Sequence, residues 1–275
     1  MSSDKMNQQQ EAYFVQNQAE TPKSSVGIFD LPTGYLTADG ELITEVQVKE
    51  ITGVEEDMLA APSIPAGKKV TQLLANCLMR VGGIADPPSL VNAARGMVTG
   101  DRVFLMLAIR RVTLGDDFPF QAQCTECNHK HLAVVNLAEL EIKPSKDPMK
   151  RVWDNTLPVS KKAVRWHVMT GKEEEALSRV SASSKNDQLS LGIAARLDML
   201  GEQPSNLEAV KALGLGDRNF LRERFDEVEG GVETEVELAC PNCGEEFKQD
   251  LDVSQSGFFF PSRIQKTSKR NTSSF

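Results

Sequence analysis

The sequence lacks any apolar run that approaches the ~18 residues needed for a membrane-spanning helix. It also begins without the apolar core of a secretory signal, so we expect a protein that is made and folds in a reducing cytosol. A glycine-rich phosphate loop, a nucleophile elbow and a histidine metal motif are all absent, which gives no support to an enzyme. We therefore expect neither a membrane partner nor a small-molecule substrate.

Cysteine and positive charge are both scarce. The 275 residues include five cysteines, and an odd count argues against a secreted disulfide framework. Acidic residues outnumber basic ones by 39 to 31, so the net charge of -8 disfavours wholesale binding to nucleic acid phosphates. Apolar residues make up 40% and charged residues 25%, which is a globular balance for two domains or one large one.

Four of the five cysteines stand in two Cys-x-x-Cys pairs. The pairs are Cys124-Thr-Glu-Cys127 and Cys240-Pro-Asn-Cys243. Four thiolates from two hairpin turns make a tetrahedral zinc site with no open position. We therefore predict one structural Zn²⁺ bound by these four side chains. The same spacing also suits two alternatives, a pair of reducible disulfides or a redox motif.

The residues that flank the two pairs help to choose among these alternatives. A strand-like run precedes each pair, at residues 118–123 and 235–239, and another strand-like run follows it. Asn128 and Gly244 come directly after the second cysteines, and these residue types best tolerate the left-handed backbone that closes such a turn. A redox motif usually sits where a strand enters a helix, and neither pair does. The flanks therefore favour zinc.

The remaining cysteine and the three histidines are weaker candidates. Cys77 lies on the apolar face of a predicted helix, so we expect a small core residue. His129 and His131 flank the first pair and would be alternative zinc ligands, but four cysteines already complete the set. His167 falls on a predicted strand without a partner in sequence, and we expect it to be structural.

An internal duplication explains why 112 residues separate the two pairs. Thr52-Gly-Val-Glu55 and Thr170-Gly-Lys-Glu173 are both capping boxes that begin a helix. Gly100-Asp-Arg-Val-Phe-Leu105 falls on Gly216-Asp-Arg-Asn-Phe-Leu221 at the same 116-residue offset as the cysteine pairs. The sequence therefore predicts an α+β fold, an internal duplication of a strand–helices–zinc-knuckle hairpin unit. The two hairpins would join in one zinc-ribbon-like site with pseudo-two-fold symmetry.

Composition suggests the boundaries of these units. We expect a disordered N-terminal tail over residues 1–25 and a C-terminal docking tail over 255–275. Between them we expect a first repeat with the first zinc knuckle over 26–142 and a second repeat with the second knuckle over 155–254. A linker over 143–154 would join the two repeats.

The repeated Gly-Asp-Arg motif invites a catalytic interpretation. We favour a structural one, in which Asp101 and Asp217 cap the helices that follow them. The acidic runs at 55–57 and 173–175 lie in the first turns of their helices, where negative charge interacts favourably with the helix dipole. Neither motif requires an acid–base role.

The C-terminal tail contains Phe258, Phe259, Phe260 and Pro261. These residues follow the end of the second repeat, so the three rings have no place in a duplicated core. We predict that the four residues bind a neighbouring subunit, because exposed apolar clusters of this kind often mark docking sites. The alternative is that the rings fold back on the second repeat.

Several short motifs together resemble a known family. They are Leu31-Pro-Thr-Gly, Val48-x-x-Ile-Thr-Gly-x-Glu-Glu-Asp, Gly100-Asp-Arg-x-Phe-Leu-Met-Leu-Ala-Ile-Arg-Arg and the cysteine pairs, spread over roughly residues 30–254. This set resembles tailed-bacteriophage baseplate and tail-assembly proteins, and is similar to the baseplate hub subunits of T4-like contractile-tailed phages.

The resemblance implies a structural or assembly role without catalytic residues. It implies other phage tail and baseplate proteins as partners, first in the host cytoplasm and then in the virion tail baseplate. A zinc-ribbon module that binds nucleic acid or a polymerase is the alternative. The acidic charge and the lack of a basic-aromatic stripe argue against it.

Overall fold

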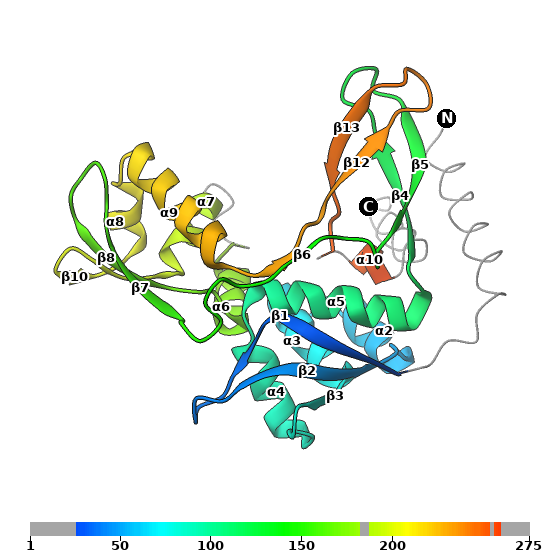
Figure 1. The fold of residues 1–275 in the computed structure, drawn as a ribbon, viewed down its shortest axis with the longest axis horizontal. Helices are drawn as coiled ribbons and strands as arrows, with labels where there is room; N and C mark the ends of the chain where they lie inside the picture. Colours follow the sequence, from blue (N-terminus) through cyan, green and yellow to red (C-terminus); the bar gives the residue numbers. More distant parts are fainter. Residues whose placement is uncertain (1–25, 182–186, 254–255, 260–275) are drawn as a thin grey trace, which may run out of the picture.

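The computed structural model describes residues 26–181, 187–253 and 256–259. The predicted N-terminal tail and most of the predicted docking tail lie outside these residues. The described part is a mixed α/β structure of two bodies, with a pair of hairpins projecting from the first body (Figure 1). None of its helices is both long and apolar enough to cross a membrane.

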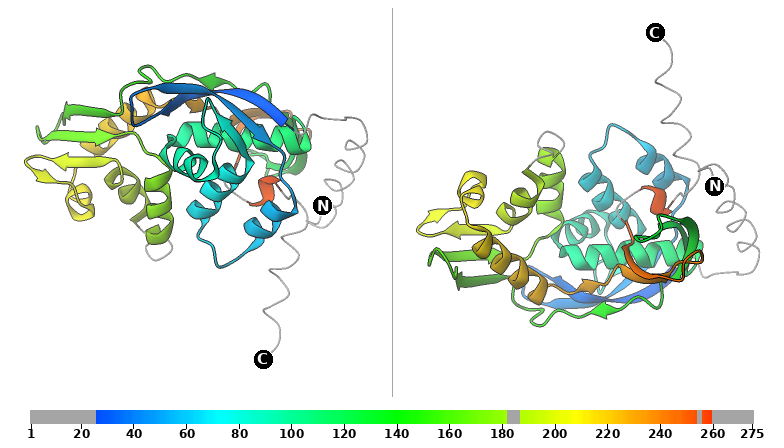
Figure 2. Two further views of the ribbon diagram at one scale, coloured as in Figure 1. Left: turned by 90° about the horizontal axis from the view of Figure 1, so that it is seen from below. Right: turned by 90° about the horizontal axis from the view of Figure 1, so that it is seen from above.

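The first body is an antiparallel sheet with helices on one side (Figures 1 and 2). The sheet has the order β1-β2-β3, with bounds Val26–Leu36, Leu42–Lys49 and Leu78–Val81. Its helices are α2 (Gly53–Ala60), α3 (Ala66–Cys77), α4 (Pro87–Gly96) and α5 (Thr99–Leu114). Strand β2 buries Val46 and Val48 toward the helices, because side chains that share one face alternate along a strand.

The second body repeats this order of elements, with a longer first helix and three shorter ones after it. Its sheet has the order β10-β9-β8-β7, with bounds Gln203–Pro204, Leu197–Leu200, Ala163–His167 and Val152–Thr156. Its helices are α6 (Gly171–Ser181), α7 (Gln188–Ala194), α8 (Leu207–Lys211) and α9 (Leu215–Val228). Both bodies thus run strand, strand, helix, helix, strand, helix, helix, hairpin, although β10 has no counterpart in the first.

Two hairpins stand side by side above α5 (Figure 1). The first is β4–β5 (Asp117–Gln123 and Lys130–Asn136), and the second is β12–β13 (Glu235–Ala239 and Glu246–Asp250). Strands β6 (Ile142–Lys143) and β11 (Gly231–Val232) pair below them. Helix α10 (Ser256–Phe259) closes the base of the hairpins.

The apolar core is divided unequally. One cluster holds the first body, both hairpins and α10, whereas a separate cluster around Trp166 holds only the second body. Trp166 stacks on Trp153 at 4.8 Å between ring centroids. The second hairpin therefore belongs to the core of the first body, although the second body precedes it in the chain.

Both predicted capping boxes are present. The Thr52 N–H donates to the Glu55 carboxylate at 2.9 Å, and the Thr170 N–H donates to the Glu173 carboxylate at 2.8 Å. Each box begins its helix at the next residue, at Gly53 in α2 and at Gly171 in α6. The prediction of these two helix starts is confirmed, since the signal is entirely local.

The prediction that Asp101 and Asp217 are N-caps is wrong. Helices α5 and α9 begin two residues before these aspartates, which lie in the first turn. The Asp101 carboxylate instead accepts backbone N–H bonds from Thr33 at 2.7 Å and Gly34 at 2.9 Å, which lie in β1. A buried carboxylate needs such donors, so both aspartates fasten the strand region that precedes their helix.

Asp217 makes the same contact in the second body. It accepts N–H bonds from Val159 at 2.8 Å and Ser160 at 3.0 Å, in the turn between β7 and β8. The expectation that these aspartates are structural stands, with a different structural role from the one predicted.

The two bodies meet where β8 leads into α6. We name residues 169–175 the α6 corner, and residues 94–102, from the end of α4 to the start of α5, the α4–α5 face. Val98 and Thr170 form an antiparallel bridge between the two. The α6 corner thus docks on the first body through the backbone as well as through side chains.

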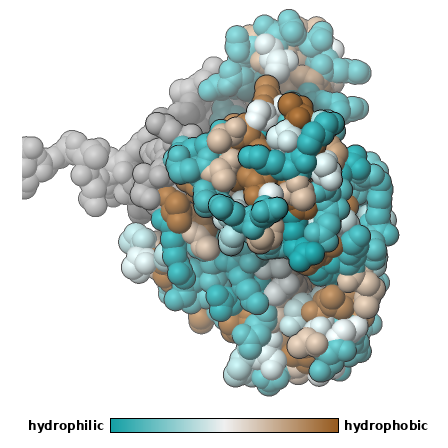
Figure 3. Space-filling model, turned by 90° about the vertical axis from the view of Figure 1, so that its left-hand side faces the viewer, coloured by the Kyte–Doolittle hydropathy of each residue, from teal (hydrophilic) through white to brown (hydrophobic). Residues whose placement is uncertain are grey.

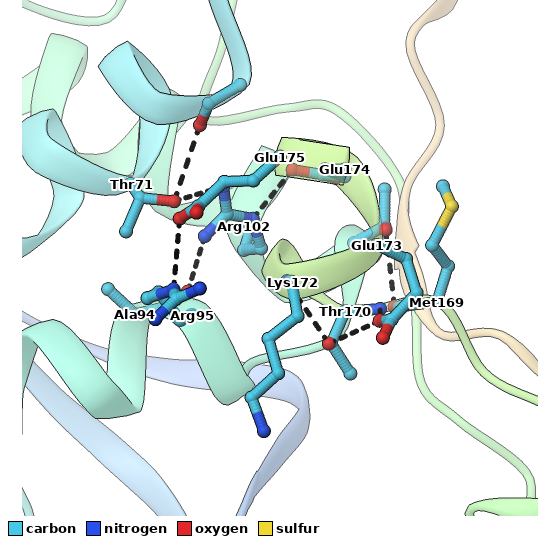
Figure 4. Close-up of polar contacts among 12 residues, drawn as sticks. Thr71, Ala94, Arg95, Arg102, Met169, Thr170, Lys172, Glu173, Glu174 and Glu175 are labelled. Atoms are coloured by element: carbon cyan, nitrogen blue, oxygen red, sulfur yellow. Dashed lines mark hydrogen bonds and ion pairs between the residues drawn. The ribbon is translucent and has the colours of Figure 1, made fainter. Parts of the chain in front are cut away.

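Two ion pairs accompany this bridge (Figure 4). The Arg102 Nε lies 2.8 Å from the Glu174 carboxylate, and the Arg95 Nε lies 3.2 Å from the Glu175 carboxylate. Arg102 is almost fully buried and also donates to the carbonyl of Ala94. Breaking a buried, paired charge costs several kcal/mol, so these contacts fix the two bodies against each other.

Candidate metal centre

The two Cys-x-x-Cys turns have the same backbone geometry. In the first, the Cys124 N–H donates to the His129 carbonyl at 3.0 Å and the Asn128 N–H donates to the Cys124 carbonyl at 3.1 Å. Asn128 has φ 56°, in the left-handed region. The prediction of a left-handed closing residue is confirmed here.

The second turn follows the same pattern. The Cys240 N–H donates to the Glu245 carbonyl at 2.8 Å, and the Gly244 N–H donates to the Cys240 carbonyl at 2.9 Å. Gly244 has φ 77°. Glycine adopts this conformation at no steric cost, so both turns curl back and point their two thiols inward.

The turns bring all four thiols together at the tips of the hairpins. The four Sγ atoms lie within 4.8 Å of one another. Cys124 Sγ lies 3.7 Å from Cys243 Sγ, and Cys127 Sγ lies 3.6 Å from Cys240 Sγ. A tetrahedral ion with bonds of about 2.3 Å would set its sulfur ligands about 3.8 Å apart. The cluster is thus of the right size to hold a metal ion.

All four cysteines are free thiols, and two of the four are shielded from water. Cys124 and Cys240 are buried, whereas Cys127 and Cys243 are exposed. The two short contacts each join a buried thiol of one hairpin to an exposed thiol of the other. The predicted pseudo-two-fold relation is therefore present at the cysteines, where exchanging the hairpins exchanges the two contacts.

That symmetry does not extend to the bodies. The α6 corner packs on the α4–α5 face, and a two-fold axis would require the matching corner at α2 to pack on the second body. A Cβ added to Gly53, at that corner, would meet no atom within 4 Å. The arrangement of the bodies is therefore one-directional, and the pseudo-two-fold relation is limited to the contacts among the four thiols.

The electrostatics of the cluster favour a cation. The backbone N–H of His129 lowers the pKa of Cys127 to about 6. The backbone N–H of Glu245 also lowers the pKa of Cys243, but desolvation and the three neighbouring thiols outweigh it and raise that pKa to about 12. One thiol thus ionises easily and another resists, because several thiolates this close repel one another unless a positive ion lies between them.

The other sequence candidates lie outside this set. His129 and His131 stack on each other at 5.9 Å between ring centroids, and His131 also contacts Phe247 edge-on. His167 pairs with Asp198 at 2.9 Å on the outer face of the second sheet. None of the three histidines joins the thiol cluster.

Cys77 is a core residue, as predicted. Its side chain is fully buried among the apolar residues of the first body. Burial raises the pKa of its thiol to about 12. It stays protonated and inert at neutral pH.

The structure adds a clasp between the hairpins that the sequence does not reveal. The side-chain amide of Gln249, in β13, accepts from the Gln123 N–H at 3.3 Å and donates to the Gln121 carbonyl at 3.3 Å. It binds the edge of β4 as a neighbouring strand would. The position that matches Gln249 in the first hairpin is Ala133, so no repeat signal marks this contact.

The phenylalanine segment differs from the expectation that it has no place in the core. Phe258 and Phe259 are buried, and the Phe258 ring lies 5.0 Å from the ring of Phe118 at the base of β4. Two rings therefore fold back within the protein, although on the first body rather than the second. Phe260 and Pro261 lie outside the described residues, and their partner binding stays a prediction.

A buried arginine explains this docking. The Arg110 Nε donates to the Phe258 carbonyl at 3.1 Å, and its guanidinium lies 5.0 Å from the Phe118 ring and 5.6 Å from the Phe258 ring. Burial lowers the pKa of Arg110 to about 10. The α10 carbonyl and the aromatic faces compensate part of its lost hydration. Sequence reasoning missed Arg110, whose partner is 148 residues away.

Comparison with known proteins gives one finding. Residues 36–155 match the family described as T4 bacteriophage base plate protein, whereas comparisons with curated proteins and with solved structures gave no match. The matched segment runs from the end of β1 to β7 and includes the first cysteine pair. It supports a structural role in a phage baseplate. The match confirms the resemblance to T4-like baseplate proteins over residues 36–155, while the likeness to hub subunits stays a prediction.

Proposed function

We propose that this chain is a zinc-stabilised, non-catalytic component of a bacteriophage tail baseplate, acting in its structure or its assembly. The observation that carries the proposal is the family match over residues 36–155. The partners would be other tail and baseplate proteins, met in the host cytoplasm during assembly and retained in the virion tail. Within the family, the sequence motifs favour a likeness to the hub subunits.

The proposed metal is a single structural Zn²⁺ on Cys124, Cys127, Cys240 and Cys243. The observed spacing of the thiols supports this choice, because four sulfur ligands leave no open position for a substrate. Each hairpin has only two strands, and such hairpins are marginally stable alone. A metal that joins them would stabilise the folded state by on the order of 10 kcal/mol. The metal would thus act as a staple between distant parts of the chain.

We further propose that residues 26–142 and 155–254 are two copies of one unit, joined by a linker at 143–154. The shared order of elements, the paired capping boxes and the paired aspartate contacts all support a duplication. Arg102 and Arg218 add a further match, since each donates to a carbonyl eight residues before it.

Two measurements test the baseplate proposal. Mass spectrometry of purified virions should detect the chain together with tail proteins. A nuclease-treated pull-down from infected cells should recover tail and baseplate proteins. Recovery of nucleic acid or a polymerase instead would contradict the proposal and favour a zinc-ribbon module.

The zinc proposal has its own test. Elemental analysis of the purified chain should give one zinc per molecule, and the four thiols should resist alkylation until a chelator is added. A chain without zinc, or rapid alkylation of all four in the native protein, would contradict it.

The docking proposal is now confined to Phe260 and Pro261, because Phe258 and Phe259 would have to leave the core to bind a partner. A chain that ends at Phe259 keeps both buried rings. We expect it to retain its zinc and its unfolding midpoint but to fail to join the baseplate. Normal incorporation of this truncated chain would rule the docking role out.

A further inference from the structure

Each body has a corner and a face, but the junction between the bodies uses only one of each. If the duplication proposed above is accepted, residues 51–57 are the counterpart of the α6 corner, and we name them the α2 corner. Residues 210–218 are the counterpart of the α4–α5 face, and we name them the α8–α9 face. These two surfaces have no partner within the described chain that corresponds to the junction.

Exposure shows the contrast between used and unused surfaces. Gly171 in the α6 corner is buried, and a Cβ added there would lie 2.4 Å from the Arg102 guanidinium. Its counterpart Gly53 is exposed, and a Cβ there would meet nothing within 4 Å. On the faces, Val98 is buried, whereas its counterpart Gly214 is exposed with nothing within 4 Å. The α2 corner and the α8–α9 face are thus exposed at the positions where the α6 corner and the α4–α5 face are buried.

The unused surfaces also keep the charges of the junction. Its two ion pairs join basic residues of the face to acidic residues of the corner. The counterparts have the same signs, with Arg218 and Lys211 on the α8–α9 face and Glu56 and Asp57 on the α2 corner. Glu56 and Asp57 are exposed. Opposite charges at matching positions favour association and fix its orientation.

Arg218 is already held in the pose that the junction uses. Its Nη1 donates to the Val210 carbonyl at 3.1 Å, just as the Arg102 Nη1 donates to the carbonyl of Ala94. Ser190 Oγ accepts a second bond from Arg218 at 3.1 Å. A guanidinium fixed in this way loses less rotamer freedom on binding. Lys211 is exposed and already contacts Asp187 at 3.0 Å, so its pair is the weaker one.

The backbone of the unused surfaces can repeat the junction bonds. In the junction, the Thr99 N–H donates to the Met169 carbonyl at 2.9 Å, and the Gly171 N–H donates to the Met97 carbonyl at 3.2 Å. The matching donors are the N–H groups of Leu215 and Gly53, the first residues of α9 and α2. The first N–H groups of a helix have no acceptor within it. Both donors are therefore suited to an acceptor from another chain.

We propose that the chain associates with further copies of itself from head to tail, the α2 corner of one copy binding the α8–α9 face of the next. A second copy is the occupant because the chain already contains this contact once, between its own bodies. The contact joins two different surfaces and is heterologous, so repetition gives a closed ring if the rotation closes and an open filament if it does not. Figure 3 views the end of the molecule where the second body lies, with small apolar groups among hydrophilic ones.

Analytical ultracentrifugation of the full chain tests this proposal. Wild-type protein should grow from one 30.2 kDa chain to larger species over about a hundredfold range of concentration. A corner variant, Glu56→Lys with Asp57→Lys, should weaken this association by about tenfold or more for each pair lost. The matched control, Asp39→Lys with Glu41→Lys, changes the charge equally on the exposed β1–β2 turn and should associate as wild type does.

A face variant completes the design. Leu215 is 69% exposed at the first position of α9. Leu215→Glu places an acid where the helix dipole favours it, so the fold should hold, while the new charge repels the acidic corner. Each variant alone should stay monomeric. Mixed in equal amounts, they should form only a species of twice the single-chain mass, because just one good corner and one good face remain.

Three outcomes would overturn the proposal. They are a wild type that stays monomeric over the whole range, variants that associate normally, and a mixture that gives no dimer. Zinc content is measured on every sample. Zinc content depends on the cysteines rather than on these surfaces. Loss of zinc with association intact would therefore contradict the metal proposal alone. Monomeric protein that keeps its zinc would contradict the head-to-tail association alone.

Discussion

The two bodies carry the same Gly-Asp-Arg motif with a buried aspartate in each, but the pKa values of the two aspartates shift in opposite directions. Burial raises the pKa of Asp101 to about 6, even though two N–H donors act to lower it. Burial also acts to raise the pKa of Asp217, but hydrogen bonds from Ser160 and Val159 outweigh it and the pKa is lowered. The motif makes the same local contact in both places. The comparison teaches that the pKa of a repeated residue depends on the tertiary packing around it as well as on its local hydrogen bonds.

The largest effect should come from the cysteines that bring the two hairpins together. Cys240→Ser removes one of the four proposed zinc ligands, and its hairpin packs into the core of the first body. Structural zinc contributes on the order of 10 kcal/mol, so we expect loss of zinc and unfolding of the first body together with both hairpins. The second body has its own core and should lose less. Hydrogen exchange resolved by segment measures this difference.

Cys77→Ser is the control for that experiment, since Cys77 lies in the first body away from the cluster. It should keep one zinc per chain. Equal loss of protection in both bodies of Cys240→Ser would show that the second core depends on the metal as well.

The next effect distinguishes the bodies at α10. Phe258 is 1% exposed and packs against Phe118. Removing a buried aromatic ring costs about 3–5 kcal/mol, so Phe258→Ala should lower the free energy of unfolding by this amount in urea titration. Phe220→Ala, at a half-buried site of the second body, should cost less. A Phe258→Ala change without effect would mean that α10 contributes little to the core.

The paired arginines give a sharper comparison. Arg102 is buried with Glu174, whereas Arg218 is half-buried and bonds only to Ser190 and Val210 among the contacts described. Arg102→Met leaves a carboxylate without its partner and should cost about 3 kcal/mol. Arg218→Met should cost about 1 kcal/mol, since it loses hydrogen bonds but strands no charge. Equal losses in the free energy of unfolding would mean that the junction between the bodies does not increase the contribution of Arg102 to stability.

The smallest effect is the pH dependence of the two aspartates. The folded-state pKa of Asp101, about 6, lies above the usual value for aspartate, so the folded state binds more protons and loses stability as pH rises from 5 to 7. This loss is about 1 kcal/mol. Asp101→Asn abolishes it, so the stability difference between this variant and wild type should shift by that amount over the interval.

Asp217 has a lowered pKa, and its contribution is complete above pH 5 and lost only at more acidic pH. The difference between Asp217→Asn and wild type should therefore stay flat between pH 5 and 7. Thermal unfolding at several pH values, with zinc content checked, measures both. A flat profile for both variants would show that Asp101 titrates normally.

The parts of this structure that sequence reasoning predicted depend on local signals. A capping box is complete within four residues, and a Cys-x-x-Cys turn within five, so both could be located at Thr52, Thr170 and the cysteine pairs. The resemblance to baseplate proteins also relied on short motifs. These signals need no knowledge of how the rest of the chain packs.

The parts that were missed depend on long-range packing. An aspartate near the start of a helix can cap that helix, or it can accept N–H bonds from a strand elsewhere in the chain. Only the tertiary structure shows that Asp101 does the second. Arg110 and Phe258 meet across 148 residues without a matching pair in the second body, where Asp226 replaces Arg110. The one-directional docking of α6 has no sequence signature either, because both corners carry the same motif.

The positions of the four cysteines along the chain determine when during synthesis the proposed metal site can form. Cys124 leaves the ribosome 116 residues before Cys240, which at about 5–20 residues per second is a delay of about 6–23 s. During this interval the first pair offers half a site, and the core of the first body lacks the second hairpin and α10. A metal bound as proposed can therefore complete its coordination only after Cys243 has been synthesised. A filled site would mark a chain that extends past Cys243, and chains truncated before it would keep two thiols without their partners, which distinguishes them before assembly begins.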